Sequence, residues 1–412
     1  MKGTRVPVMN CGSTRRARWR APATVLAAGV LLAACGGSGG ERERADAAPV
    51  PHGHVEGAEE TAEAQWRLVL TEADGGRVRT LDPATGETAP AGEGAGEPAG
   101  VTAVGTDGRF AYLSTPDGLR VFDGGTWTVD HGDHVHHYRA DARTVGRLDV
   151  PEAPGVSGDP AVTALAAGGK VRVLDRKALD AGKVAELARI PGRVAVAHAG
   201  HLVVASADGE VAVHGRDGRR VSRLPAACPE PRGQAATRRG AVLGCADGAL
   251  LVTGEGGAFR AAKIAYPGAV PRAERAAEFR HRPGSDVLAA RAGDAGAWVL
   301  DVRARAWHRV GDGPAVAVNA VGADAPVLLL GRDGALRSYD PATGEELART
   351  DLLDDPDGAD GAAPVIEVDT ARAYVSDPAA RAVHEIDYND DLRTARTFDL
   401  PFSPAHMVET GW

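Results

Sequence analysis

The feature that most constrains the fold is a unit that recurs along the chain from Trp66 onward. Each unit has a short strand of alternating apolar and polar residues, a turn with Gly or Asp, and another strand. The clearest copies read RVRTLDPATG at 77–86 and LRSYDPATG at 336–344. The other copies lie at 119–124, 171–175, 211–215, 250–254, 298–301 and 383–387. These eight units recur about every 44 residues, a period that is typical of β-propeller blades.

The repeats predict an all-β fold, an eight-bladed β-propeller over residues 65–412, with seven blades as the alternative count. The abundance of Gly and Pro, 53 and 26 residues, also favours short elements joined by turns. The first unit, residues 66–87, is one strand short, and residues 404–409 resemble a strand left over. Pairing the two would close the ring with the C-terminal strand and remove its exposed edges.

The N-terminal 34 residues contain six basic residues and no acid, and they end in an apolar run over 21–34. This pattern is typical of a secretory signal, and the run is too short to span a membrane. It ends Leu-Ala-Ala-Cys35, which resembles the bacterial lipobox and implies a lipid anchor on Cys35, outside the cytoplasmic membrane. A plain cleaved signal with an incidental Cys35 is the alternative. Residues 35–64 are polar and rich in Gly, and they predict a flexible tether.

Removal of residues 1–34 takes the formal net charge from −9 to −15, because six basic residues are lost. A chain this acidic is unsuited to binding nucleic acid. Cys228 and Cys245 remain in the exported part, where disulfides persist, and they predict a structural disulfide. A thiolate metal site is the minority alternative, because two lone thiols at this spacing match no zinc ribbon.

A histidine run, DHGDHVHHY at 130–138, holds four of the thirteen histidines within seven residues. In an extended segment His134 and His136 share a face, and a turn at Gly132 would let His131 fold back toward them. Imidazole nitrogens suit Zn²⁺, which takes four ligands in most protein sites. A solvated loop is the alternative, but the remaining histidines are scattered singly or in pairs. The predicted zinc site contains His131, His134, His136, His137 and the acidic neighbour Asp133.

Two other places add candidate metal residues. His52 and His54 form a His-x-His motif beside glutamates in the tether, which can bind a metal ion weakly. If the C-terminal strand is the inner strand of the first blade, His406 and Glu409 become neighbours of the histidine run.

The run at Trp127–Ala140, on an exported propeller with a histidine-bearing tail, resembles the AztD family of zinc metallochaperones. Residues 228–248, 372–378 and 384–387 are also similar to that family. The resemblance implies an extracytoplasmic carrier that passes Zn²⁺ to the solute-binding protein of a zinc ABC importer. It implies that the four histidines of the run bind zinc and that His52 and His54 match the mobile tail. The chain departs from the family in having few histidines in its tail, and in having Pro231–Gln234 where a histidine is expected.

Zinc carriage without catalysis, by a monomer, is the leading interpretation. The second class is a metal-dependent hydrolase, in which Asp133 or Glu409 would act as the general base beside an open coordination position. No nucleophile elbow is evident in the sequence. The third class is a cell-surface interaction propeller. Nickel and copper stay open as alternative metals, since imidazole binds both.

Overall fold

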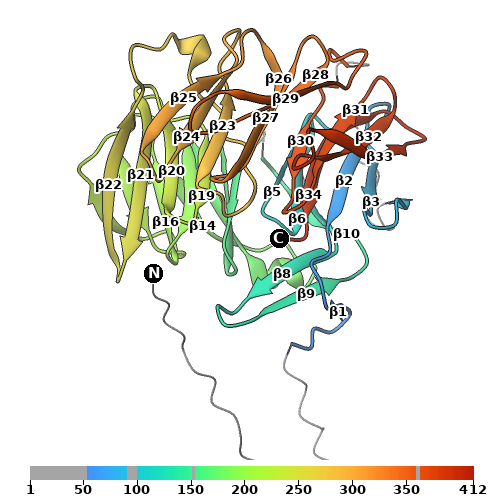
Figure 1. Ribbon diagram of the computed structural model, residues 1–412. Helices are drawn as coiled ribbons and strands as arrows, with labels where there is room; N and C mark the ends of the chain where they lie inside the picture. Colours follow the sequence, from blue (N-terminus) through green and yellow to red (C-terminus); the bar gives the residue numbers. More distant parts are fainter. Residues whose placement is uncertain (1–52, 91–99, 151–153, 359–361) are drawn as a thin grey trace, which may run out of the picture. The chain divides into compact units, whose positions relative to one another are not determined.

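The computed structural model describes residues 53–90, 100–150, 154–358 and 362–412. The predicted signal peptide, the lipid site at Cys35 and the candidate ligand His52 lie outside these residues. The regular secondary structure of the described part is almost entirely β-strand (Figure 1). Its helices are α1 (Arg176–Asp180) and the 3₁₀ turn Arg272–Glu274, and none in this part is long and apolar enough to cross a membrane.

Antiparallel sheets follow one another along the chain, each built from strands that are consecutive or nearly so. The first sheets contain β5 (Ala103–Thr106), β6 (Phe110–Thr115), β7 (Gly118–Asp123) and β10 (Arg143–Leu148); β11 (Gly155–Gly158), β12 (Val162–Ala167), β13 (Lys170–Asp175) and β14 (Glu186–Pro191); and β15 (Val194–His198), β16 (His201–Ala205), β17 (Val211–His214) and β18 (Arg220–Leu224). Then come β19 (Gln234–Thr237), β20 (Gly240–Cys245), β21 (Gly248–Glu255) and β22 (Ala258–Ala265), followed by β23 (Val287–Arg291), β24 (Ala297–Asp301) and β25 (Ala306–Val310). The last two contain β26 (Ala315–Gly322), β27 (Ala325–Gly331), β28 (Ala335–Tyr339) and β29 (Glu346–Asp351), and β30 (Ile366–Val368), β31 (Ala373–Asp377), β32 (Ala382–Asp387) and β33 (Arg393–Asp399).

Strands from early and late in the propeller share one further sheet. In it β2 (Arg67–Glu72) pairs with β3 (Val78–Leu81), and β3 pairs with β4 (Thr88–Pro90). On its other edge β2 pairs with β34 (Pro404–Thr410), the last strand of the chain. The predicted pairing of the C-terminal strand with the incomplete first unit is therefore confirmed. The fold is a β-propeller, while the number of blades and the closure of the whole ring stay predictions.

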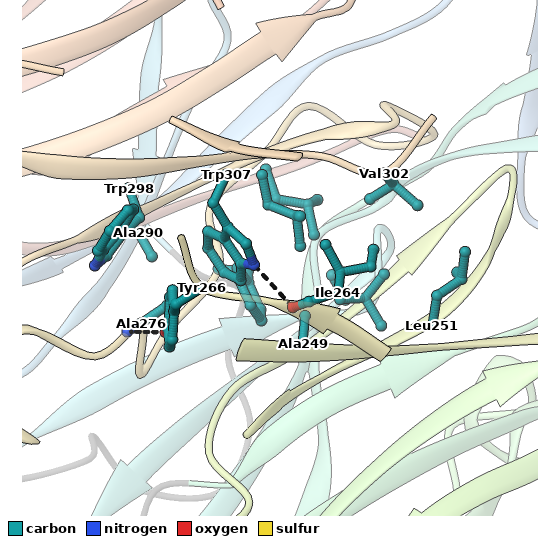
Figure 2. Packing of buried hydrophobic residues seen from close by; sticks show 14 of the residues in the cluster. Ala249, Leu251, Ile264, Tyr266, Ala276, Ala290, Trp298, Val302 and Trp307 are labelled. Carbon is teal, nitrogen blue, oxygen red and sulfur yellow. Dashed lines mark hydrogen bonds between the residues drawn. The ribbon is translucent and has the colours of Figure 1, made fainter. Parts of the chain in front are cut away.

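The burial pattern of the strands explains why the sheets stack against one another. Central strands such as β6 are buried on both faces, whereas outer strands such as β14 alternate between exposed and buried residues. Figure 2 shows one of the resulting cores, between the sheet of β19–β22 and that of β23–β25. There the Trp307 indole packs on Tyr266 and donates a hydrogen bond to the Ile264 carbonyl at 3.0 Å.

Cys228 and Cys245 form a disulfide, as predicted. Both cysteines are buried in the core shared by the sheets of β15–β18 and β19–β22. The bond links the loop before β19 to the end of β20. It therefore stabilises the packed sheets, and the two cysteines do not form a thiolate metal site.

Part of the segment predicted as a tether is ordered against the rest of the protein. Residues Glu59–Thr61 form β1, which pairs with β9 (Val135–Arg139), the second strand of a hairpin with β8 (Thr126–Asp130). The composition of residues 35–64 gave no sign of this strand. It forms because β9 would otherwise present an open edge of unpaired backbone groups.

Candidate metal centre

The β8–β9 hairpin carries the histidine run and is inserted between the paired strands β7 and β10. Its base is held by aromatic contacts. The Trp127 and Tyr138 rings, which face each other across the hairpin, stack with centroids 5.1 Å apart. The Arg109 guanidinium lies 3.6 Å from the centroid of the Trp127 ring and also pairs with Asp123 at 2.9 Å. The base of the inserted hairpin is therefore anchored to the propeller, and the tip of the hairpin projects away from the sheet of β5, β6, β7 and β10.

The tip of the hairpin is a four-residue turn that brings His131 back over the strands. The His131 amide donates to the His134 carbonyl at 3.0 Å, and the Gly132 amide donates to the Asp130 carboxylate at 2.7 Å. Gly132 has a φ of +89°, a conformation that side-chain-bearing residues rarely adopt. The sequence-based expectation of a turn at Gly132 thus corresponds to the observed backbone.

Three imidazoles converge at this tip. The ring centroids of His131 and His134 are 5.0 Å apart, those of His131 and His136 are 5.3 Å apart, and those of His134 and His136 are 4.8 Å apart. One nitrogen from each ring lies within 4.8 Å of the others. In a tetrahedral zinc site, with Zn–N distances of about 2.0–2.1 Å, such nitrogens lie about 3.4 Å apart. His131 and His134 are exposed and His136 is buried, so reaching zinc-binding geometry requires movement of the two exposed rings toward His136.

Two carboxylates contact the Nδ1 atoms of these imidazoles. Glu60 Oε1 lies 2.6 Å from His136 Nδ1, and Asp133 Oδ1 lies 2.7 Å from His134 Nδ1. An imidazole that donates its Nδ1 proton to a carboxylate presents the Nε2 lone pair to a metal, and the contact fixes the orientation of the ring. Asp133, which was predicted alongside the ligands, therefore occupies the position of an outer partner of His134.

The N-terminal segment 53–61 lies across the face of the hairpin that bears the cluster. Its strand β1 supplies Glu60, and the Tyr138 hydroxyl donates to the Gly53 carbonyl at 2.7 Å. A Cβ atom on Gly53 would lie 2.8 Å from the His136 ring, so only glycine fits this close approach. Sequence reasoning missed the role of Glu60, because a contact across 76 residues leaves no local pattern. The acidic residues beside His54 were the only available signal.

The structure places the other predicted residues of this region away from the cluster. His137 points to the opposite face of β9, where its Nδ1 lies 3.0 Å from Thr128 Oγ1; that hydroxyl donates to the Gly411 carbonyl. His54 is exposed and follows Gly53 directly, but it is not among the three converging histidines. His137 therefore supports the hairpin, and His54 lies at the edge of the site.

His406 and Glu409, which were expected beside the histidine run, lie on β34 instead and do not join the cluster. His406 Nε2 is 3.1 Å from the Val101 carbonyl, and burial lowers the pKa of this imidazole. Glu409 is 2% exposed, and burial raises the pKa of its carboxyl well above the usual range. The pairing of β34 with the first sheet brings Thr410 and Gly411 to the hairpin, where they contact Thr126 and Thr128.

Comparison with known proteins finds solved structures that have a similar fold. No family model matches the sequence, and no curated protein matches it. The crystal structure of AztD from Citrobacter koseri is similar, with a TM-score of 0.69 and 18% identity over 85% of this chain and 99% of that chain. Apo AztD from the same organism gives a TM-score of 0.68 with 17% identity, covering 84% and 98% of the two chains. The chain therefore has an AztD-type fold.

A second, weaker likeness is to an enzyme. The dihydro-heme d1 dehydrogenase NirN matches with a TM-score of 0.51 and 16% identity, over 84% of this chain and 75% of that one. At these identities the likenesses concern the fold alone.

Proposed function

We propose that this protein is an extracytoplasmic zinc carrier that delivers Zn²⁺ to the solute-binding protein of a zinc ABC importer. The observation that carries the proposal is the convergence of His131, His134 and His136 at the tip of one hairpin. Neutral imidazoles suit Zn²⁺, and the carboxylates on two of them set the tautomer that binds a metal.

The exposure of the cluster suits transfer better than storage. His136 is 8% exposed and fixed by Glu60, so it acts as the anchor of the site. His131 and His134 are exposed, so an incoming ligand can displace them one at a time while His136 keeps the ion. Ligand exchange of this kind lets zinc move between two proteins without passing through water as a free ion.

The N-terminal segment is proposed to assist the cluster. Gly53 lies beside the His136 ring, so close that an added Cβ would be 2.8 Å from it, and His54 follows Gly53 directly. His54, together with His52, would then act as a weaker and exchangeable ligand pair at the edge of the main site. This role agrees with the tail that the sequence resemblance to zinc metallochaperones implies.

The cellular setting is proposed from the sequence. The lipobox-like end of the signal supports a lipid anchor on Cys35 at the outer face of the cytoplasmic membrane. A monomer in that position can meet the solute-binding protein of an importer. The net negative charge of the exported chain disfavours nucleic acid as a partner.

Carriage is proposed in preference to catalysis. A hydrolytic zinc site needs an open coordination position with a general base beside it. The carboxylates nearest the cluster, Glu60 and Asp133, both contact imidazole Nδ1 atoms, which is an orienting position. The dehydrogenase NirN has a similar fold, but the likeness points to no residue of this cluster.

The test is a zinc titration of the full chain against a competing chelator. The wild type is compared with a variant in which His131, His134 and His136 are all changed to Ala, and with His137→Ala as the matched control on the other face of β9. We expect the wild type and the control to bind one Zn²⁺ tightly and the triple variant to lose that binding with its fold intact. Equal binding by all three proteins would refute the assignment.

Transfer is tested with the same proteins. Zinc-loaded wild type is mixed with a zinc-free solute-binding protein of a zinc importer, and the metal on each partner is measured after separation. The carrier proposal requires transfer that is faster than release of zinc to an equally strong chelator. Transfer no faster than that would leave a zinc-binding protein without carrier function.

A further inference from the structure

The short strand β1 covers only part of the outer edge of the histidine hairpin. It is the outermost strand of the three-stranded sheet β1–β9–β8 (Figure 1). β9 has five residues, and β1 pairs with three of them, Arg139, Tyr138 and His137. The ladder therefore ends at the pair of Thr61 with His137, one pair short of His136 and two short of Val135 at the tip.

β1 is also held by few contacts. Its residues Glu59 and Glu60 are exposed, and Thr61 is half-buried, so the strand buries no apolar side chain. Besides the three backbone pairs, the segment is fixed by the contact of Glu60 with His136 and by the hydrogen bond from Tyr138 to the Gly53 carbonyl. A segment with so little buried surface opens locally at a lower free energy than the packed sheets.

The register shows what a longer strand would do at this edge. A strand that paired antiparallel with all of β9 would replace β1 and continue to His136 and Val135. Directly opposite residues in such a pair point to the same face, with Cβ atoms about 4.5–5.5 Å apart. The residue opposite His136 would therefore lie on the face where the imidazoles converge. The residue that follows β1 in this chain, Ala62, is exposed and has no metal-binding group.

Replacement of β1 would also change the zinc site itself. Glu60 Oε1 lies 2.6 Å from His136 Nδ1, and Glu60 leaves this position when β1 leaves β9. Loss of an outer partner of this kind lowers metal affinity about 10–100-fold. Pairing of an incoming strand and loosening of the bound ion are thus one event.

We propose that β9 is the docking edge for the protein that receives zinc, and that its occupant is an extended strand of that acceptor. The strand carries a histidine or a carboxylate at the position that faces His136, where it can take the ion. This docking role rests on the proposed carrier function and names the surface through which the carrier acts. Backbone pairing along an exposed edge is a known mode of recognition, and five pairs would replace three. Val135 is 47% exposed and offers the strand an apolar contact on the other face.

The experiment fixes β1 in place with a cross-link. Glu59 and Arg139 are directly opposite in the register and lie outside the histidine cluster, so Glu59→Cys combined with Arg139→Cys joins the two strands by a disulfide. The controls are the two single cysteine variants of the full chain with the new thiol alkylated. Zinc affinity is measured by competition with a chelator. The rate of zinc transfer to the zinc-free solute-binding protein of a zinc importer is measured on the same samples.

We expect the cross-linked protein to bind zinc as tightly as the wild type, because Glu60 and the three histidines are kept. It should transfer zinc at least about tenfold more slowly, because Glu60 can no longer leave His136. The alkylated single variants should transfer zinc like the wild type. Equal transfer rates for the cross-linked protein and the wild type would overturn the docking role and leave the carrier function standing. A wild type that binds zinc but transfers it no faster than to a chelator would refute both.

Hydrogen exchange decides the question if the two cysteines do not form a bond. Zinc-loaded wild type is mixed with an excess of the same solute-binding protein, and backbone amide exchange is followed in β1 and β9. We expect the amides of residues 59–61 to lose protection while those of β9 keep theirs, since another strand takes the edge. Unchanged protection of residues 59–61 during transfer would overturn the proposal.

Discussion

The histidine hairpin and the inner cavity wall are two polar regions built on opposite principles. The hairpin gathers imidazole nitrogens at an exposed tip, inserted between β7 and β10, with carboxylates on their outer side. The inner cavity wall, which surrounds a cavity of about 1250 Å³, instead buries oxygen-bearing side chains on inner strands, among them Asn319 and Glu409, which are each 2% exposed. The first region suits an ion that arrives and leaves, whereas the second holds polar groups that are shielded from solvent.

The two regions also differ in how strongly the stability of the fold depends on their side chains. Removing side chains from the hairpin tip leaves the stacked sheets untouched, because the tip contacts mainly the segment 53–61. Removing groups from the cavity wall changes the balance of charge inside the stack of sheets. Changes at the hairpin should therefore alter zinc affinity without altering the stability of the fold. Changes within the packed sheets should lower stability and leave zinc affinity unaltered.

The sharpest test of that contrast compares His136→Ala with His137→Ala. His136→Ala should weaken zinc binding at least about a hundredfold, since it removes a direct ligand and loss of an outer partner alone costs 10–100-fold. His137→Ala removes only the contact with Thr128 and should keep zinc affinity within about threefold of wild type, by the same comparison. Competition with a chelator measures both. Equal losses in the two variants would mean that both faces of β9 bind zinc.

Loss of the disulfide tests whether the stability of the packed sheets is independent of zinc binding at the hairpin. Changing both Cys228 and Cys245 to Ser opens a link between residues 17 apart and should reduce the free energy of unfolding by about 3 kcal/mol. Zinc affinity of the folded variant should stay unchanged, because the bond lies in the core of the sheets β15–β22. Denaturant unfolding and zinc titration are run on the same sample. A matching loss of zinc affinity would show that the hairpin depends on the framework after all.

Glu60→Gln addresses the link between the tail and the hairpin. The variant loses the charged partner of His136 Nδ1, and zinc affinity should fall about tenfold, as for other outer carboxylates. Glu59→Gln changes an exposed neighbour on the same strand and serves as the control. If both variants bind zinc like the wild type, Glu60 only packs against His136 and does not orient it.

The smallest expected effect concerns the buried carboxyl of Glu409. Its pKa is raised in the folded state, so above the ordinary value near 4.5 the unfolded chain releases the proton first and stability falls as pH rises. Glu409→Gln removes this loss, so the variant should melt higher than the wild type at pH 7 and no higher at pH 4. The groups that act on Glu409 are Asp369 and Glu367. A variant that melts lower at pH 7 would show that the carboxylate has a cationic partner.

Much of the hairpin could be read from local sequence. The alternation of a strand placed His134 and His136 on one face, and Gly132 supplied the turn that returns His131 to them. The same alternation excluded His137 from that face, although the sequence-based set included it. The contribution of Glu60 was out of reach, because it depends on β1 pairing with an edge strand 76 residues away.

The sequence by itself determined the all-β architecture, the pairing of the last strand with the first sheet, the disulfide and the position of the histidine cluster. Each of these follows from short-range periodicity, from turn residues or from the count of a rare residue type. Only the tertiary structure decided which side chains meet: Glu60 with His136, and Arg280 with Glu367. Such contacts join strands that are distant in the chain, and the packing of one sheet on the next sets them, so no local pattern encodes them.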